Sequence, residues 1–237
     1  MTKKYILTIL ATAFCLISMA QDDLKLKLDS IATSGLEKGI PGIQVVISDS
    51  KGYTIYNYGH HEIEKTTEVN DSTRWRYGSI TKVFTAVMIL QLESEGKLSI
   101  DDSVTKYIDL KQHNAAGITI KHLLNHSSGL YNYTASKKLK WEDTPNQCLE
   151  NSLKRKLNFT PGSKYDYCNT GYVILGLIIE KITAQSYQQN ITERIFKPCG
   201  LESMIYCSDD KIPFNTARGY KIKHNKYTDF TEIDHSW

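Results

Sequence analysis

The segment that follows Gly78 constrains the fold of this chain more than any other. Its apolar residues would occupy most sides of a helix until Gly96 ends it; they are Val83, Phe84, Val87, Met88, Ile89, Leu90 and Leu92. Such a helix is stable only when other elements cover nearly all of its surface, so we expect it to be buried. A second apolar run predicts another helix over residues 170–184. The chain therefore needs a sizeable helical core.

Strand signals lie on both sides of this helical region. Residues 42–48 and 53–58 are rich in β-branched and aromatic residues, and the turn residues 49–52 between them predict a β-hairpin. A helix is expected before it, over residues 22–38, and a closing hairpin over residues 220–223 and 226–230. Shorter helices are predicted over residues 120–126, after the N-cap Thr119, and over residues 186–196.

These strands do not add up to a complete sheet. A lone hairpin is marginal in water and needs at least a third strand with a packed face. Its outer edge would also expose unpaired backbone groups. We therefore expect this chain to lack C-terminal strands, with position 237 interrupting a longer reading frame.

The first 20 residues have the features of a secretory signal. Lys3 and Lys4 supply the basic start, residues 6–19 the apolar stretch, and Ser18-Met19-Ala20 a cleavage site with small residues. The apolar stretch is short for a membrane span, so we favour cleavage after Ala20 over retention as an anchor. We expect a secreted or periplasmic bacterial protein, free of the membrane after cleavage, with one domain over residues 21–237.

Composition and side-chain spacing exclude several other classes of protein. The net charge is only +3, and two of those charges belong to the leader, so no nucleic-acid groove or polybasic membrane patch is indicated. The pairs His60/His61 and His122/His126 lack a third ligand at suitable spacing, so no metal site or other cofactor is predicted. The cysteines after the leader show no metal or disulfide signature, and a Cys199–Cys207 bridge stays open.

The chemistry points to Ser79-Ile80-Thr81-Lys82, at the start of the long apolar helix. One helical turn places Lys82 beside Ser79, and the first-turn N–H groups favour a developing anion. Ser-x-x-Lys occurs five times in the chain, at Ser48, Ser79, Ser94, Ser103 and Ser208. Only the pair at Ser79 combines fixed spacing with the positive end of a long helix. It predicts a nucleophile and a candidate base for acyl transfer.

An ordered series of further motifs accompanies this one. They include residues 92–102, 118–130 and 159–162, Tyr167-Cys168-Asn169 with the run to Gly176, and residues 195–201 and 217–220. Over residues 41–220 the chain resembles the serine β-lactamase and penicillin-binding-protein superfamily, most of all its class C β-lactamase-related group. The resemblance implies an α/β (α+β) transpeptidase-like fold: an antiparallel sheet with flanking helices, a helical subdomain over about residues 79–200, and C-terminal strands missing here.

The same resemblance implies the roles of four residues. Ser79 would be the acylated nucleophile, Lys82 its hydrogen-bonded partner, and Tyr167 the general base or proton shuttle. Asn169 would bind substrate. Apart from these four, His126 and Ser127 are interpreted as structural residues that cap and brace the helix end near the site. A phenol ordinarily ionises near pH 10, so Tyr167 needs an ammonium beside it to act as a base. Whether Lys82 or Tyr167 takes the proton stays open.

One family motif is absent from the sequence. Relatives carry Lys or His two residues before a glycine on a strand that lines the cleft, whereas Asn169, Ile174, Pro198 and Ala217 stand two residues before the later glycines here. We expect an exported, monomeric serine hydrolase that acts on an amide, ester or β-lactam, with a small-molecule or peptide substrate that could be related to peptidoglycan. The alternative is a truncated, catalytically silent binding protein of the same fold.

Overall fold

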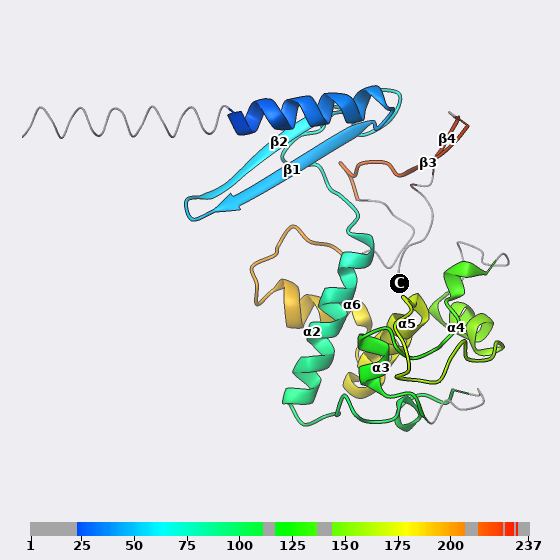
Figure 1. Cartoon of the computed structure of the whole chain (residues 1–237). Helices are drawn as coiled ribbons and strands as arrows, with labels where there is room; N and C mark the ends of the chain where they lie inside the picture. The colour runs from blue at the N-terminus through cyan, green and yellow to red at the C-terminus, as the bar shows by residue number, and fades with distance from the viewer. Residues whose placement is uncertain are drawn as a thin grey trace, which may run out of the picture. The chain divides into compact units, whose positions relative to one another are not determined.

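The computed structural model describes residues 23–110, 117–136, 144–206, 213–224, 226–229 and 231 (Figure 1). These residues form two compact units, each considered by itself. We call residues 23–76 with 213–231 the hairpin unit and residues 77–206 the helical unit. The predicted leader, Cys207 and Phe230 lie outside the described residues, so the leader and the Cys199–Cys207 bridge stay predictions. In the described part of the chain, no helix is both long and apolar enough to cross a bilayer.

The hairpin unit contains a helix over residues 23–37 and two antiparallel hairpins. Strands β1 (Gly42–Asp49) and β2 (Gly52–Gly59) pair in continuous register, which confirms the first predicted hairpin. The helix packs on this hairpin (Figure 1), and the Tyr58 hydroxyl donates a hydrogen bond of 2.9 Å to Asp29. Strands β3 (Tyr220–Lys223) and β4 (Lys226–Asp229) form the second hairpin, also as predicted.

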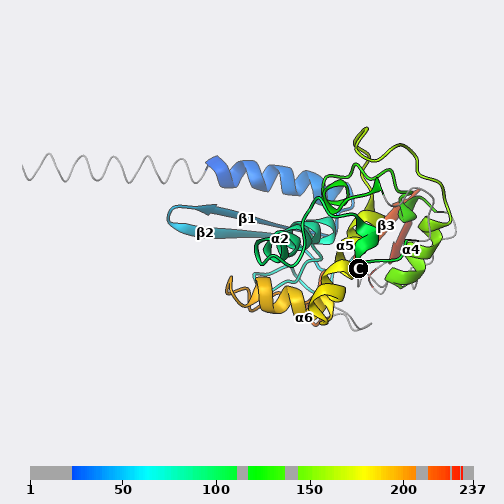
Figure 2. The ribbon, with the colours of Figure 1, turned by 90° about the horizontal axis from the view of Figure 1, so that it is seen from below.

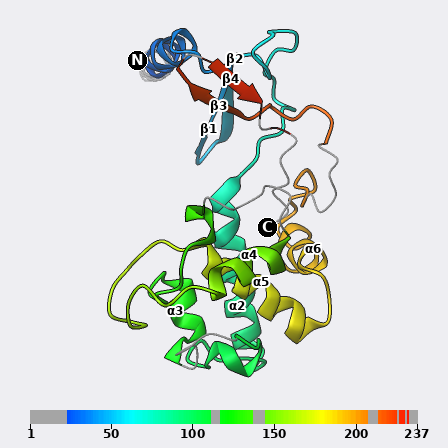
Figure 3. The same ribbon diagram turned by 90° about the vertical axis from the view of Figure 1, so that its right-hand side faces the viewer.

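The helical unit is built around α5 (Asn169–Thr183). Helix α2 (Thr81–Ser94) lies on one side of it and α4 (Pro145–Leu153) on another, as Figure 1 and Figure 2 both show. Helix α6 (Tyr187–Ile191) and the π-helical turn η5 (Thr192–Phe196) follow α5 along the chain, and α6 packs against it (Figure 3). The remaining elements are η1 (Gly78–Ile80), η2 (Val104–Lys106), α3 (Ile120–Leu124) and η4 (Tyr133–Ala135).

A single apolar cluster fills the helical unit. Its fully buried side chains are Met88, Ile89, Leu92, Val104, Ile118, Ile120, Leu123, Ile174, Leu175, Ile178 and Ile179. They come from α2, α3, α5 and the connecting segments, so the cluster ties together elements that are distant in sequence. This cluster is the helical core that the two long apolar runs predict.

The expectation that α2 is buried on nearly all sides is wrong. Ile80, Val83, Val87 and Leu90 are between 39% and 59% exposed, whereas Met88, Ile89 and Leu92 are completely buried. The neighbours of α2 include α5, α6 and η5, and they cover the face that carries Met88 and Leu92. Residues 80, 83, 87 and 90 repeat at helical spacing and share another face.

One helix and one helix boundary also differ from expectation. Helix α4 was not among the predicted elements, although Thr144 caps it by accepting the Gln147 N–H and Pro145 occupies its first turn. Helix α3 ends at Leu124, two residues before the predicted end, because His126 adopts a left-handed backbone conformation with φ of +59°. Its N-cap is Thr119 as predicted, and the Nδ1 atom of His122 accepts the Thr119 N–H.

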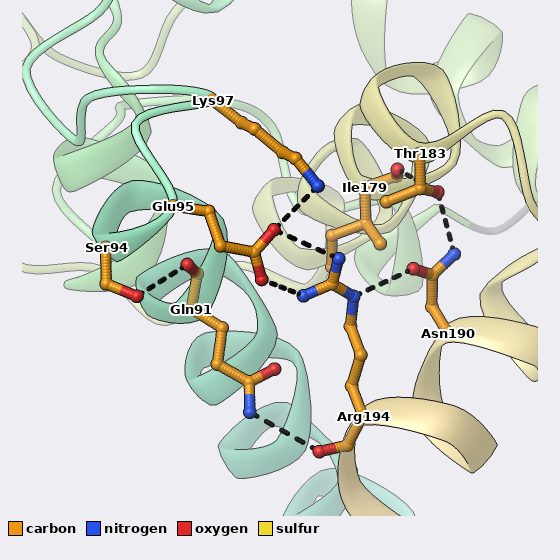
Figure 4. A network of polar contacts seen from close by, with 8 residues as sticks. All are labelled: Gln91, Ser94, Glu95, Lys97, Ile179, Thr183, Asn190 and Arg194. Carbon is orange, nitrogen blue, oxygen red and sulfur yellow. Dashed lines mark hydrogen bonds and ion pairs between the residues drawn. The ribbon is translucent and has the colours of Figure 1, made fainter.

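A polar network joins the end of α2 to η5 (Figure 4). The Arg194 guanidinium donates to both carboxylate oxygens of Glu95 at 2.5 and 3.3 Å, and its Nε donates to Asn190. Asn190 in turn donates to Thr183 near the end of α5. The hydrogen bond from Arg194, followed by that from Lys97, lowers the pKa of Glu95 to about 2. The network therefore braces α2, α5 and η5 against one another.

Candidate active site

Ser79 lies in the short 3₁₀ turn η1, which continues directly into α2. The preceding Gly78 has φ of +51°, a conformation that glycine adopts without steric cost. This turn brings the chain into the helix and leaves Ser79 exposed at its start. The position matches the expected one, at the end of a helix where first-turn N–H groups lack partners within the helix.

Two functional groups converge on the Ser79 hydroxyl. The Lys82 ammonium, one turn further along, donates a hydrogen bond to Ser79 Oγ at 3.1 Å. The Tyr167 hydroxyl, which belongs to the segment just before α5, donates to the same oxygen at 2.8 Å. The Lys82 nitrogen also lies 5.2 Å from the centre of the Tyr167 ring. The structure thus brings together the three residues that the sequence analysis grouped as catalytic.

The surroundings of Tyr167 alter its acidity. Partial burial would raise the pKa of the phenol, but hydrogen bonds to Lys82 and Ser79 and the positive charge of Lys82 outweigh burial. The pKa of Tyr167 is therefore lower than that of an ordinary tyrosine. A lowered pKa increases the fraction of phenolate near neutral pH, and a phenolate can accept the proton of Ser79.

Asn169, the fourth predicted site residue, is the first residue of α5. Its backbone N–H donates to Asn132 Oδ1 at 3.2 Å, and its side-chain amide donates to Thr134 Oγ1 at 3.3 Å. Asn132 also donates to the Tyr167 carbonyl, at 3.5 Å. Asn169 therefore contacts the segment around η4, and its predicted contact with substrate stays a prediction.

Tyr172 and Asn132 are near the site but were not predicted from the sequence to belong to it. Tyr172 belongs to the first turns of α5, and its ring centre lies 5.5 Å from the Lys82 nitrogen. The Tyr172 hydroxyl donates to the Leu124 carbonyl at the end of α3, which fixes the ring beside Lys82. These contacts join α2, α3 and α5, and spacing along the chain carries no signal for them.

A separate hollow of about 510 Å³ lies beside α3. Its lining includes Asp101, Lys121, His122 and Lys164, and none of Ser79, Lys82 and Tyr167 lines it. Its lining contains two lysines and a single carboxylate. Ser79 and Tyr167 are exposed on the surface of the helical unit, away from this hollow.

Comparisons with known proteins identify relatives of this chain. The family model described as Beta-lactamase matches residues 26–237. Protein flp of Staphylococcus aureus strain MW2 is 30% identical over 214 residues, which are 85% of this chain and 42% of that protein. The teichoic acid D-alanine hydrolase of Staphylococcus aureus is 31% identical, over 82% of this chain and 47% of that protein. The chain thus spans less than half the length of these relatives.

A solved structure has the same fold. The D-stereospecific amidohydrolase from Streptomyces sp. superposes with a TM-score of 0.74 and is 29% identical in sequence. The match covers 84% of this chain and 62% of that one. The antiparallel strands and the helical unit therefore belong to a β-lactamase and transpeptidase-like fold.

Proposed function

This chain belongs to the β-lactamase family, within the serine β-lactamase and penicillin-binding-protein superfamily, and on that premise we propose that it is a serine hydrolase acting through an acyl-enzyme at Ser79. The observation that carries the proposal is the convergence of the Lys82 ammonium and the Tyr167 hydroxyl on Ser79 Oγ. A serine hydroxyl is a weak nucleophile until a neighbouring base removes its proton.

The reaction begins when Ser79 Oγ attacks the carbonyl carbon of the substrate. As the new bond forms, the hydroxyl proton passes to the Tyr167 phenolate or to an unprotonated Lys82, and the carbonyl oxygen becomes an oxyanion. The oxyanion collapses, the bond to the leaving group breaks, and the same proton is delivered to the leaving nitrogen or oxygen. Water then attacks the acyl carbon, the bond to Ser79 Oγ breaks, one proton of the water returns to Ser79 Oγ through the same base, and the carboxylic acid product leaves.

The oxyanion requires hydrogen-bond donors that already point toward it before the reaction, so that no free energy is spent on reorienting them. The Ser79 N–H lies in the first turn of a helix, where the dipole favours negative charge. The family motif of Lys or His two residues before glycine, whose strand supplies a second donor, is absent from these 237 residues. Loss of one such donor costs about 3 kcal/mol of transition-state stabilisation. This absence favours a second candidate function, ligand binding without turnover.

For the substrate we propose a D-aminoacyl ester or amide, hydrolysed by an exported enzyme of the class C β-lactamase-related type. Two relatives support this choice, because one is a teichoic acid D-alanine hydrolase and the other a D-stereospecific amidohydrolase. The leaving group would be an alcohol or an amine. Both reactions pass through the same acyl-enzyme at Ser79.

Labelling with a fluorescent penicillin and with a fluorophosphonate tests the proposal. We expect the full chain to be labelled and the Ser79→Ala variant to lose the label. Ser94→Ala is the matched control, because Ser94 also precedes a lysine by three residues but lies at the C-terminal end of α2. A label that persists in Ser79→Ala would refute the nucleophile assignment. A folded chain that neither probe labels would favour binding without turnover.

A further inference from the structure

His126 has a backbone conformation that normally favours glycine. It follows the C-cap residue Asn125 of α3, and its φ is +59°. Helices commonly end with glycine in this left-handed conformation, and a side chain there is strained. A histidine at this position therefore requires compensating contacts that glycine could not make.

Two hydrogen bonds to His126 bracket Tyr167 along the chain. The Asp166 N–H donates to the His126 carbonyl at 2.8 Å. The Cys168 N–H donates to the Nδ1 atom of the His126 ring at 3.2 Å. Residues 166 and 168 are thus both fixed to residue 126, and the backbone of Tyr167 between them has little freedom to move.

The His126 ring also contacts the Tyr167 side chain directly. The two ring centres are 4.5 Å apart with the planes tilted by 39°, and the Tyr172 ring lies 5.2 Å from the same imidazole. Aromatic pairs at such separations attract one another. The imidazole therefore supports the ring whose hydroxyl contacts Ser79.

The ring can accept the Cys168 N–H only while Nδ1 carries no proton. Burial, and then the positive charge of Lys82, lower the pKa of His126, so the neutral ring is favoured. The titratable groups on the elements packed against it are Lys82 on α2, Tyr165, Asp166, Tyr167 and Cys168 before α5, and Tyr172 on α5. Acid would convert Nδ1 into a donor and break the contact with Cys168.

We propose that His126 is a positioning residue, whose neutral ring and backbone carbonyl hold the Tyr167 phenol against Ser79 and Lys82. From the sequence, His126 was expected only to brace the helix end. The catalytic part of this proposal rests on the proposed function. Its geometric part, that the His126 ring fixes the position of the Tyr167 phenol, can be tested without measuring turnover.

Two variants separate the ring from the backbone. His126→Gly suits the left-handed conformation but removes the ring, so the backbone bond to Asp166 can persist while the Cys168 contact is lost. His126→Asn also tolerates this conformation, and its Oδ1 occupies the position of the missing Nδ1 along the side chain. The matched control is His224→Gly, because His224 is an exposed histidine with φ of +48° in the hairpin unit.

The primary measurement is the pKa of the Tyr167 phenol, followed by NMR in the full chain with ¹³C-labelled tyrosine. We expect the pKa to rise toward its ordinary value in His126→Gly, because the phenol moves away from Lys82. It should remain low in His126→Asn and in His224→Gly. A folded His126→Gly variant that keeps the wild-type pKa of Tyr167 would overturn the proposal, whereas a purely structural role would lower stability without moving this pKa.

The wild-type protein provides a second measurement that needs no variant to fold. As acid protonates His126, the amide resonance of Cys168 should shift at the same pH, and an unchanged resonance would also overturn the proposal. The labelling rate then separates this inference from the proposed function. If the wild type reacts with the fluorophosphonate, His126→Gly should react about 10²-fold more slowly. If the wild type does not react, the proposed function fails, and the phenol titration still decides the role of His126.

Discussion

Two tyrosines, one in each unit, face opposite charges. In the hairpin unit, Tyr58 donates to the Asp29 carboxylate, and burial followed by this hydrogen bond raises its pKa to about 12. In the helical unit, Tyr167 faces the Lys82 ammonium, and its pKa is lowered. The same side chain is thus kept protonated in one unit and made easier to ionise in the other. The neighbouring charge therefore adds to the effect of burial on the pKa of Tyr58 and opposes it at Tyr167.

The two units also differ in how they are packed. Among the described residues, the buried apolar side chains of the hairpin unit are Ala32 and Val69, whereas the helical unit contains the large apolar cluster around α5. The helical unit also contains Ser79, Lys82 and Tyr167. A catalytic site requires groups that packed neighbours hold in place, and among the described residues the large apolar cluster lies in the helical unit.

Exchanging each tyrosine for phenylalanine is the strongest test of this contrast. Tyr167→Phe should slow acylation of Ser79 by about 10²–10⁴-fold, because a general base is lost. In the wild type, the labelling rate should rise with pH through the lowered pKa of Tyr167, since the phenolate is the reactive form. That rise should disappear in Tyr167→Phe. A time course of labelling with a fluorophosphonate, quenched at set times and repeated across a pH series, measures both effects.

Tyr58→Phe is the control for this experiment. It removes a hydroxyl that donates to Asp29 and should leave both the labelling rate and its pH dependence unchanged. Equal losses of labelling rate in the two variants would mean that both hydroxyls affect the rate only through folding. Such a result would contradict the proposed difference between the two tyrosines. A Tyr167→Phe variant with the full wild-type rate would assign the proton transfer to Lys82.

The difference in packing predicts that an isoleucine-to-alanine substitution lowers the free energy of unfolding by unequal amounts in the two units. Ile178→Ala, at a fully buried site in α5, should lower the free energy of unfolding by about 2–5 kcal/mol through the cavity it leaves. Ile222→Ala, at a half-exposed site in β3, should cost below about 1 kcal/mol. Urea unfolding followed by circular dichroism at the helix band measures both. Equal costs would contradict the idea that the helical unit holds the principal core.

The elements that the sequence predicts well depend on local signals. The first hairpin follows from its β-branched strands and the turn at Ser50-Lys51, and α5 follows from its continuous apolar run. The burial of α2 was predicted wrongly because apolar periodicity shows which residues can be buried and not which neighbours cover them. Helix α4 was overlooked, although Thr144 and Gln147 form a capping box that could have revealed its start.

The candidate site shows the same limit. One helical turn links Ser79 and Lys82, so their contact follows from local geometry. Tyr167 lies 88 residues from Ser79 in the sequence, and only the resemblance to a family indicated that they meet. The positioning role proposed for His126 depends on its left-handed backbone conformation and on contacts with residues about 40 positions later in the chain. Neither feature leaves a pattern in the sequence.

The smallest expected effects concern the ion pairs of the two units. Arg194 is mostly buried and binds Glu95 and Asn190, so Arg194→Ala should cost about 1 kcal/mol of stability. Arg218 is half exposed and pairs with Asp229, so Arg218→Ala should cost about 0.5 kcal/mol or less. Urea unfolding at neutral pH compares the two variants. A larger loss for Arg218→Ala would mean that the hairpin unit depends more on its charges than its packing suggests.

Lowering the pH tests the Arg194–Glu95 ion pair further. The Glu95 pKa is lowered from 4.5 to about 2, so the stability that its pairing contributes is complete above pH 4.5 and is lost as the pH falls through about 2. The difference in stability between the wild type and Arg194→Ala should therefore shrink over this window. High salt should reduce the Arg218 effect more than the Arg194 effect, because exposed charges are screened more strongly than partly buried ones. A difference for Arg194→Ala that stays constant down to pH 2 would show that the arginine stabilises α2 and η5 through packing and not through its charge.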